Sequence, residues 1–435
     1  MSGRILLLGA SGFIGSEIAQ ALATDGHQIT GLTRDPAAAL RAQAGISWRQ
    51  CDLRSMTRSE DWHALLDGST VIINASGTLQ TGLRDDVVRV QEAAILALIE
   101  AAKTAGARQF VQISAAGAEL QSASPFMATK ARADAALAQS GILHAILRPG
   151  LVIGRNAFGG TELIRATAGL PLVHLVVSGT GSIQCVGMAD LIDAVHKVVA
   201  SPAKWRGTHD LVARDGLPLE QIVEHHRRWL GHREPRFRLS LPVGLLRPVS
   251  LLADGLGWLG WRSPLRSNAV AALISGVAGD ADATARLLAR EPLDLERALG
   301  QLGPAGKADR WHSRLALAYP LGLASLVLLW LGSGILGLTR TATASALLVE
   351  DGMAQGLADL LVLGGSLADL AIGLGLCWRP LLGKALLGGL VLAGAYLASS
   401  LAYGADLWLD PLAPLLKVLP VMALTLFCLA MKDER

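Results

Sequence analysis

The chain has 435 residues, of which 51% are apolar and only 17% are charged, with a formal net charge of +3. Soluble domains carry about a quarter charged residues, so this composition excludes a disordered chain and argues against a wholly soluble one. The 39 basic and 36 acidic residues are nearly balanced and form no basic stripe, so we predict no nucleic-acid partner. The four cysteines include no C-x-x-C pair, which predicts neither a metal site nor a disulfide framework.

The first two thirds of the chain alternate short apolar runs with helix-like segments. The expected strands are 4–9, 28–33, 46–50, 71–74, 110–114 and 145–148, and the clearest helical spacing covers 15–24 and 87–102. Strands separated by single helices form parallel β-α-β units with right-handed crossovers. We therefore predict an α/β doubly wound parallel sheet, with a Rossmann core over residues 1–155.

A glycine-rich turn, G-A-S-G-F-I-G, joins the first strand to the first helix. Gly9 permits the tight turn, Gly12 lets backbone amides approach a pyrophosphate, and Gly15 lets the helix pack closely on the strand. The positive end of the helix then faces the phosphates. Because a strand precedes the turn and a helix follows it, the turn predicts dinucleotide binding. The same turn supplies further expected cofactor contacts, Ser11, Phe13 and Ile14.

The end of the second strand indicates which dinucleotide is bound. Asp35 and Pro36 are typical of a helix N-cap followed by the first helical residue, which leaves Arg34 to face the cofactor. A basic side chain at this position holds a 2′-phosphate, so Arg34 favours NADP(H) over NAD(H). Asp52 and Leu53 follow the third strand and are expected to border the adenine.

Residues 156–310 are expected to form a smaller lobe over the pocket, interleaved with the core. Within this lobe, residues 239–260 are apolar but interrupted by Arg247 and Asp254, too often to span a bilayer. Trp258 and Trp261 at the end of the run suit an interfacial helix lying on the membrane, and an amphipathic helix covering the pocket is the alternative. The run H-H-R-R at 225–228 is interpreted as a solvated helix face without metal-binding geometry.

The last part of the chain, 311–435, is predicted to be an all-α transmembrane domain of four helices. Residues 315–339 and 385–405 carry no charge, and each run is long enough to cross about 30 Å of hydrocarbon. Residues 357–378 and 411–431 are also apolar, apart from Asp359, Asp369 and Lys417. Many glycines in these runs suit close packing of helices in lipid.

The charges in the connecting segments predict how these spans are oriented. The connectors on one side of the predicted membrane carry the bases Arg310, Arg314, Arg379, Lys384 and Lys432. The other side is mainly acidic, so the basic side is expected to be cytoplasmic. We therefore predict a protein of the inner (cytoplasmic) membrane with four spans, and with both termini and the Rossmann domain in the cytoplasm. The lipid bilayer is accordingly a predicted partner.

Two ionisable residues fall inside the predicted spans. Asp369 lies ten residues before Arg379, or about 15 Å along a helix, which brings it near the bilayer centre. A lone carboxylate there is costly. We therefore predict either an ion pair between Asp369 and Lys417 or a protonated Asp369, with a functional role or a structural one.

Several short motifs resemble the short-chain dehydrogenase/reductase superfamily, in its extended and atypical branches. They are the glycine turn, D-L at 52–53, N-A-S-G at 74–77, I-S-A-A-G at 113–117, R-P-G at 148–150 and V-G-M-A-D at 186–190. The resemblance is greatest to the nucleotide-binding accessory subunit of respiratory complex I and its bacterial relatives, and it implies that Ala75, Ser76 and Gly77 contact the cofactor. Residues 315–430 resemble the DoxX-like family through L-A-D-L-A-I-G-L at 367–374 and L-W-L-D-P-L at 407–412.

The chain departs from the superfamily at its catalytic Tyr-x-x-x-Lys motif. Phe126 stands where the tyrosine is expected, although Lys130 keeps the position of the lysine. The only three tyrosines of the chain lie at position 319 or later, in the predicted membrane part. The resemblance implies that Lys130 contacts the nicotinamide ribose, and Ser114 and Lys130 are the catalytic candidates that remain.

These observations leave several functions open. Phe126 favours a membrane-anchored NADP(H)-binding protein without tyrosine-dependent catalysis, which senses the nucleotide or supports a membrane or redox complex. The alternative is an NAD(P)H-dependent oxidoreductase that acts on a lipophilic substrate, a quinone or a lipid, with another proton source. Nucleotide-gated transport by the four helices rests only on the charges inside the spans.

Overall fold

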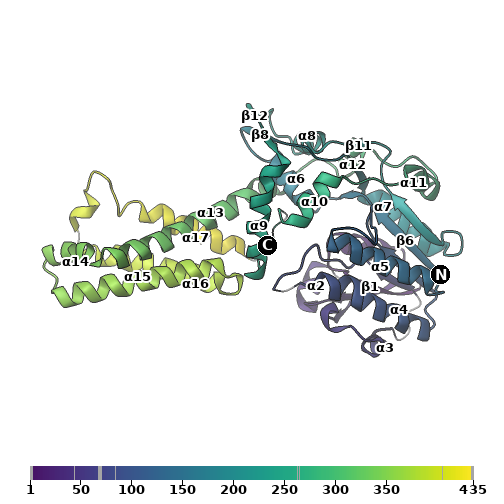
Figure 1. The fold of residues 1–435 in the computed structure, drawn as a ribbon, viewed down its shortest axis with the longest axis horizontal. Helices are drawn as coiled ribbons and strands as arrows, with labels where there is room; N and C mark the ends of the chain where they lie inside the picture. Colours follow the sequence, from purple (N-terminus) through teal and green to yellow (C-terminus); the bar gives the residue numbers. More distant parts are fainter. Residues whose placement is uncertain are drawn as a thin grey trace. The chain divides into compact units, whose positions relative to one another are not determined.

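A computed structural model of the protein describes residues 3–43, 45–66, 71–83, 85–261, 263, 265–403 and 405–432. The chain forms two compact units (Figure 1), one made of Met1–Gly255 and Ser263–Ser313 and the other of Leu256–Arg262 and Arg314–Arg435. The first unit includes both the core expected at 1–155 and nearly all of the lobe expected at 156–310.

The first unit is built on a seven-stranded sheet in the order β10-β6-β5-β4-β1-β2-β3, and every pair of neighbours is parallel. Its strands are β1 (Arg4–Leu8), β2 (Gln28–Thr33), β3 (Ser47–Gln50), β4 (Val71–Asn74), β5 (Gln109–Ile113), β6 (His144–Pro149) and β10 (Gly207–Leu211). The predicted doubly wound parallel sheet is thus confirmed. Leu8 lies opposite both Leu32 and Asn74, so the carboxyl ends of β2, β1 and β4 are level.

Helices cover both faces of this sheet because its strands are apolar on both sides. Ile5 and Leu7 pack in the core beneath α1 (Phe13–Thr24) and α7 (Met188–Ala200). Leu6 and Leu8 pack in the opposite core, which includes α4 (Ala94–Thr104) and α5 (Pro125–Gln139). The shorter helices α2 (Pro36–Ala42) and α3 (His63–Leu66) follow β2 and β3.

The lobe contains two further small sheets. Strands β7 (Leu151–Ile153), β9 (Ile183–Gly187) and β11 (Gly216–Leu217) form one, and β8 (Val173–Ser178) and β12 (Phe237–Pro242) form a parallel pair. Its helices are α6 (Gly160–Ala168), α8 (Leu219–Trp229), α9 (Leu246–Trp258), α10 (Ser267–Ser275), α11 (Ala281–Leu288) and α12 (Leu295–Gln301). Arg266 and Asn268, at the start of α10, donate hydrogen bonds to the carbonyls of Thr81 and Leu79, so the lobe is fastened to the loop that follows β4.

Two predictions within the lobe are wrong. The segment 239–260 is not one helix, because its first residues belong to strand β12, which pairs with β8. Helix starts only after this strand, with a 3-10 turn at Val243–Leu245 that leads into α9. The run at 225–228 is not a solvated face either. His226 and Arg227 are buried, and Arg227 donates hydrogen bonds to the carbonyls of Ala168 and Leu170 at 3.1 and 2.9 Å. Burial lowers the pKa of His226 to about 4, so this imidazole is neutral.

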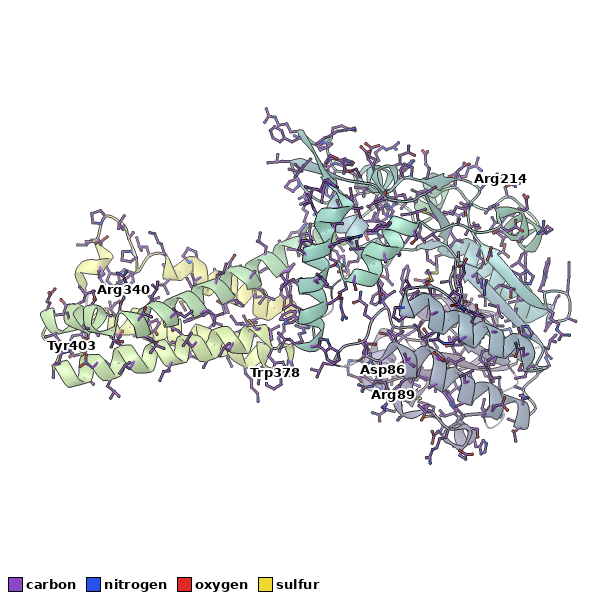
Figure 2. The ribbon with its side chains drawn as sticks, viewed as in Figure 1. Asp86, Arg89, Arg214, Arg340, Trp378 and Tyr403 are labelled. Carbon is purple, nitrogen blue, oxygen red and sulfur yellow. The ribbon has the colours of Figure 1, made fainter. Side chains whose placement is uncertain are left out.

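The second unit consists mainly of apolar helices. They are α13 (Lys307–Thr339), which begins in the first unit, α14 (Thr341–Glu350), α15 (Gln355–Cys377), α16 (Leu382–Ser399) and α17 (Val418–Met431). Three of the described helices, α13, α15 and α16 with its preceding turn, are long and apolar enough to cross a membrane, and α17 is shorter. Figure 2 shows Arg340 and Tyr403 at one end of this bundle and Trp378 at the other, as expected of helices that alternate in direction. Helix α14 was not predicted.

Asp369 is held inside the bundle by hydroxyl groups and not by Lys417. It is buried and accepts hydrogen bonds from Ser333 of α13 at 2.5 Å and Tyr396 of α16 at 2.8 Å. Lys417 is exposed at the start of α17, and no ion pair joins it to Asp369 within the described residues. The predicted pair is therefore wrong, because the fourth helix begins later than expected and leaves Lys417 outside it.

Candidate functional site

The glycine turn after β1 forms a tight cradle whose shape requires glycine at positions 9 and 15. Gly9 has a φ of +70°, and its carbonyl accepts a hydrogen bond from the amide of Gly12 at 2.9 Å. A Cβ on Gly15 would lie 2.1 Å from the Gly9 oxygen, and one on Gly9 would lie 2.7 Å from the oxygen of Ala75. Gly12 itself is exposed. The cradle therefore fits a pyrophosphate, which approaches bare backbone at a helix N-terminus.

The turn after β4 lies against this cradle and is fixed by a polar network. The Asn74 side chain donates to the Gln112 side chain at 2.9 Å and accepts from the amide and the hydroxyl of Ser76 at 3.0 and 2.5 Å. The amide of Ala75 donates to the carbonyl of Leu8 at 3.1 Å. Gly77 is exposed at the end of the turn. The predicted contacts 75–77 are thus beside the glycine turn.

The ends of β2 and β3 carry the residues expected around the adenosine. Ser11 donates to the hydroxyl of Thr33 at 3.2 Å, and Asp35 caps α2 by accepting from the amide of Ala38, as predicted. The Arg34 guanidinium is 51% exposed and pairs with Asp85 at 3.2 Å.

Asp52, beside the half-buried Leu53, forms a close ion pair that the sequence analysis missed. Its carboxylate accepts hydrogen bonds from the Arg54 side chain at 2.6 to 3.1 Å, and these bonds hold the pKa of Asp52 below its usual range. Arg54 lies only two residues along the chain, in the short 3-10 turn that Asp52 caps. This edge of the site therefore carries two arginines.

Lys130 is buried beside the β4 turn. Its ammonium donates to the carbonyl of Ile113 at 2.9 Å and lies 5.6 Å from the centre of the Phe126 ring, one helical turn earlier on α5. A Cβ on Gly77 would lie 3.8 Å from the Lys130 nitrogen, so the amine faces the exposed turn. Burial lowers the pKa of Lys130 from its usual 10.5 to about 8. The Lys130 amine therefore keeps its proton at neutral pH and loses it above about pH 8, which ordinary assays can reach.

Ser114 is already committed to another partner. Its hydroxyl donates to Asp134 of α5 at 2.7 Å, and the same carboxylate oxygen accepts two hydrogen bonds from Arg148 at 3.0 and 3.1 Å. Asp134 is only 3% exposed, and burial raises its pKa. Asp134 was not singled out from the sequence, although its spacing of four residues from Lys130 predicts that both face the sheet.

Phe13 and Ile14 are predicted contacts at the start of α1. Both are half-buried, and a Cβ on Gly154 would lie 3.0 Å from the Phe13 ring and 3.1 Å from the Met188 methyl group. The ring thus packs where β7 ends and α7 begins. Cofactor contact by these two side chains stays a prediction.

Two protein families match separate parts of the chain. A family described as NAD(P)H-binding matches residues 9–178, and the DoxX-like family matches residues 327–426. The first match includes the glycine cradle and Lys130, and the second includes Asp369.

Two curated reductases are similar to more than half of the chain. The ceramide reductase of Caulobacter vibrioides is 28% identical over 257 residues, which cover 58% of this chain and 77% of the relative. The 3-diazoavenalumate denitrifying reductase of a Streptomyces species is 28% identical over 285 residues, which cover 59% of this chain and 88% of the relative.

Solved structures share the fold of the first unit. An NADPH-dependent quinone oxidoreductase from Escherichia coli, complexed with NADPH, superposes with a TM-score of 0.51 at 23% identity, covering 68% of this chain and 99% of that one. A UDP-N-acetylglucosamine 4-epimerase from Bacillus cereus gives a TM-score of 0.51 at 14% identity, covering 69% and 95%. The chain therefore joins an NAD(P)H-binding domain with a Rossmann fold to a C-terminal DoxX-like domain.

Proposed function

We propose that the protein is a membrane-anchored, NAD(P)H-dependent reductase of a lipophilic acceptor that works without a catalytic tyrosine. The observation that carries this proposal is the buried Lys130, whose amine faces the turn next to the glycine cradle while Phe126 occupies the position of the phenol. Support for reduction, in preference to nucleotide sensing alone, comes from the two similar reductases.

In this proposal, one part of the site binds the dinucleotide and another donates the proton. The glycine cradle and the β4 turn would hold the pyrophosphate and the nicotinamide side of the dinucleotide, which supplies a hydride when bound. The Phe126 ring has no proton to give, and the Ser114 hydroxyl is donated to Asp134. Lys130 is the remaining acid of the two candidates, and its pKa of about 8 suits proton transfer near neutral pH.

NADP(H) is the proposed cofactor. Support comes from Arg34 at the carboxyl end of β2 and from Arg54 nearby, because two guanidinium groups match a 2′-phosphate better than a ribose hydroxyl. Arg34→Ala should weaken binding of NADPH about tenfold or more and leave NADH unchanged, as expected for one hydrogen bond to a charged group. Arg41→Ala, an exposed arginine of α2, is the matched control.

A lipophilic acceptor is favoured by the apolar exterior around β12 and α9. Exposed side chains there include Phe237, Leu239, Leu245, Leu251 and Leu252. Within the second unit, Trp261 donates to the carbonyl of Cys377 at 2.6 Å and the Arg379 amide donates to the carbonyl of Leu259 at 3.0 Å. The residues at and after the end of α9 thus contact the turn between α15 and α16, which supports α9 as an interfacial helix at the membrane surface.

The arrangement in the membrane completes the proposal. We propose that α17 is a fourth span beside α13, α15 and α16, and that both termini and the Rossmann domain face the cytoplasm of an inner membrane. Support for the orientation comes from Arg379, which lies in the turn between α15 and α16, and from Lys384 in the first turn of α16. Cysteine accessibility in intact spheroplasts tests it, because Cys377, beside this turn, should stay protected from an impermeant reagent until the membrane is opened.

The enzymatic test uses the purified full chain in detergent or nanodiscs. NADPH oxidation is followed with ubiquinone and menaquinone analogues, a 3-oxo-sphingolipid and a soluble diazo compound, and Lys130→Met is compared with Lys103→Met, an exposed lysine of α4. We expect turnover with a lipophilic acceptor that falls as pH rises through about 8 and is lost in Lys130→Met alone. Stoichiometric binding of NADPH without turnover on any acceptor would refute the proposal.

That second outcome would favour the other candidate function, which is suggested by Phe126. In this case the protein binds the nucleotide as a sensor or as a supporting subunit of a membrane or redox complex, as the resemblance to the complex I accessory subunit implies. Copurification of a stable partner complex with bound nucleotide would support it. Membership of such a complex stays a prediction.

A further inference from the structure

A buried histidine in the lobe has no hydrogen-bond partner on one ring nitrogen. His174, in the middle of β8, is only 1% exposed, and its Nε2 atom makes no hydrogen bond. The Oε1 of Glu220 lies 3.9 Å from this nitrogen, which is too far for a hydrogen bond. A buried polar nitrogen left in this state costs free energy, and its lone pair or proton faces carboxylates.

Two carboxylates from one helix share this position. Glu220 and Glu224 are four residues apart on α8, so they project from the same face, and α8 packs against β8. One ligand atom from each of the three residues lies within 4.8 Å of the other two. Figure 1 shows α8 beside the β8–β12 pair.

The cation now nearest to the carboxylates is Arg238. It lies directly opposite His174 in the pairing of β8 with β12 and donates to Glu220 at 3.5 Å and to Glu224 at 3.1 Å. Its side chain is 64% exposed, so each of these ion pairs is weak. The guanidinium satisfies the carboxylates but leaves the imidazole nitrogen without a partner.

We propose that His174, Glu220 and Glu224 bind a divalent transition-metal ion of the Zn²⁺ or Mn²⁺ class. One imidazole and two carboxylates match the ligands that these ions prefer, whereas Mg²⁺ and Ca²⁺ prefer oxygen alone. Ligands about 2.1 Å from a tetrahedral ion lie about 3.4 Å apart. The two half-buried glutamates therefore need to close by about 1 Å while the guanidinium of Arg238 swings into solvent.

The three ligands do not lie together in the sequence, which is why the sequence did not reveal the site. Residues 220 and 224 have the spacing of helical ligands, but the third ligand lies 46 residues earlier, on a strand. An ion held by all three would join α8 to the β8–β12 pair. It is separate from the nucleotide cradle, so metal binding and NADPH binding can be measured independently.

The test uses the tag-free, metal-stripped full chain in detergent. Co²⁺ binding is followed by its visible absorption and Zn²⁺ or Mn²⁺ binding by calorimetry, with Mg²⁺ as the comparison ion. We expect one Co²⁺ fewer per chain in His174→Ala than in the wild type, and affinity weakened about a hundredfold or more in Glu224→Gln. His225→Ala, a half-buried histidine of the same helix, should bind as the wild type does.

A substitution of Arg238 should strengthen metal binding, where the substitutions above should weaken it. If the guanidinium competes with the ion, Arg238→Leu should bind Co²⁺ more tightly than the wild type. NADPH binding by every variant verifies that the chain is folded, and Glu224→Gln tests the proposal even where His174→Ala does not fold. Equal stoichiometry and affinity in the wild type and Glu224→Gln would overturn the proposal and leave an ion-pair cluster only.

Discussion

Replacing glycines of the cradle by alanine should separate the needs of the fold from those of the nucleotide. Gly12 has a φ of −85°, which any residue adopts, and a Cβ there would lie 3.1 Å from the Gly9 oxygen, a contact relieved by a shift of a few tenths of an ångström. On Gly15 the same oxygen would be 2.1 Å away, which is 1.3 Å short of an ordinary 3.4 Å contact. Because the Cβ on Gly15 would meet backbone atoms of Gly9, no flexible side chain can move to relieve the contact.

The two variants should therefore fail in different ways. Gly12→Ala should change the free energy of unfolding by less than about 1 kcal/mol, but its methyl group blocks the approach of the pyrophosphate and should weaken NADPH binding about a hundredfold. Gly15→Ala should lose binding and also about 1–3 kcal/mol of stability through overpacking. Gly300→Ala is the matched control, because Gly300 lies in α12 with open space around its Cβ position.

The measurements are NADPH titration by calorimetry and thermal unfolding in the same detergent. Gly300→Ala should bind normally and gain about 0.5–1 kcal/mol, because alanine restricts the unfolded chain more than glycine does. Wild-type affinity in Gly12→Ala would show that the dinucleotide does not approach this turn. That result would refute the account of the site, since the roles given to Lys130 and Arg34 follow from it.

Three further predictions concern buried charges. Asp134→Asn should lower stability by about 3–5 kcal/mol in chemical unfolding, because Arg148 loses its buried partner, and a loss under 1 kcal/mol would contradict this. Between the lowered pKa of Lys130, about 8, and its usual 10.5, this amine keeps its proton in the unfolded chain and loses it in the folded one, so the contribution of Lys130 to stability, measured as the difference between the wild type and Lys130→Met, should rise with pH across this window. Lys130→Met should lack this contribution and add up to about 3 kcal/mol at pH 7, and equal slopes in the two proteins would contradict it. In the bundle, Asp369→Leu should cost about 1–2 kcal/mol by leaving two hydroxyls without their acceptor. Lys417→Leu should leave the stability almost unchanged in the same thermal assay. Equal losses of stability in the two variants would instead support an ion pair between Asp369 and Lys417.

Local patterns were enough to predict the core of the fold. The expected strands 28–33 and 71–74 have those bounds in the structure. The run 71–74, V-I-I-N, is buried throughout and almost wholly apolar, as is typical of a strand covered on both faces. The glycine turn and the cap at Asp35 were also evident, since their conformations depend on neighbouring residues. The sheet and the cradle therefore follow from short-range chemistry.

Long-range pairing explains what could not be predicted. The residues of β12 are apolar enough for a helix or a strand, and only pairing with β8, more than sixty residues earlier, decides between them. The carboxylate partner of Ser114 and the hydroxyl partners of Asp369 likewise come from other helices. For the same reason Lys417 was mistaken for the partner of Asp369, because its true position depends on where α17 starts.

The split of the second unit along the chain has a consequence for biosynthesis. Residues Leu256–Arg262 belong to the bundle, yet their partners Cys377 and Arg379 are translated more than a hundred residues later. While the ribosome makes α13 to α15, the indole of Trp261 has no partner to pack against. Strand β10, the last strand of the seven-stranded sheet, has already been made by then. We therefore expect this stretch to stay unpacked during membrane insertion until α15 and the turn after it have been made.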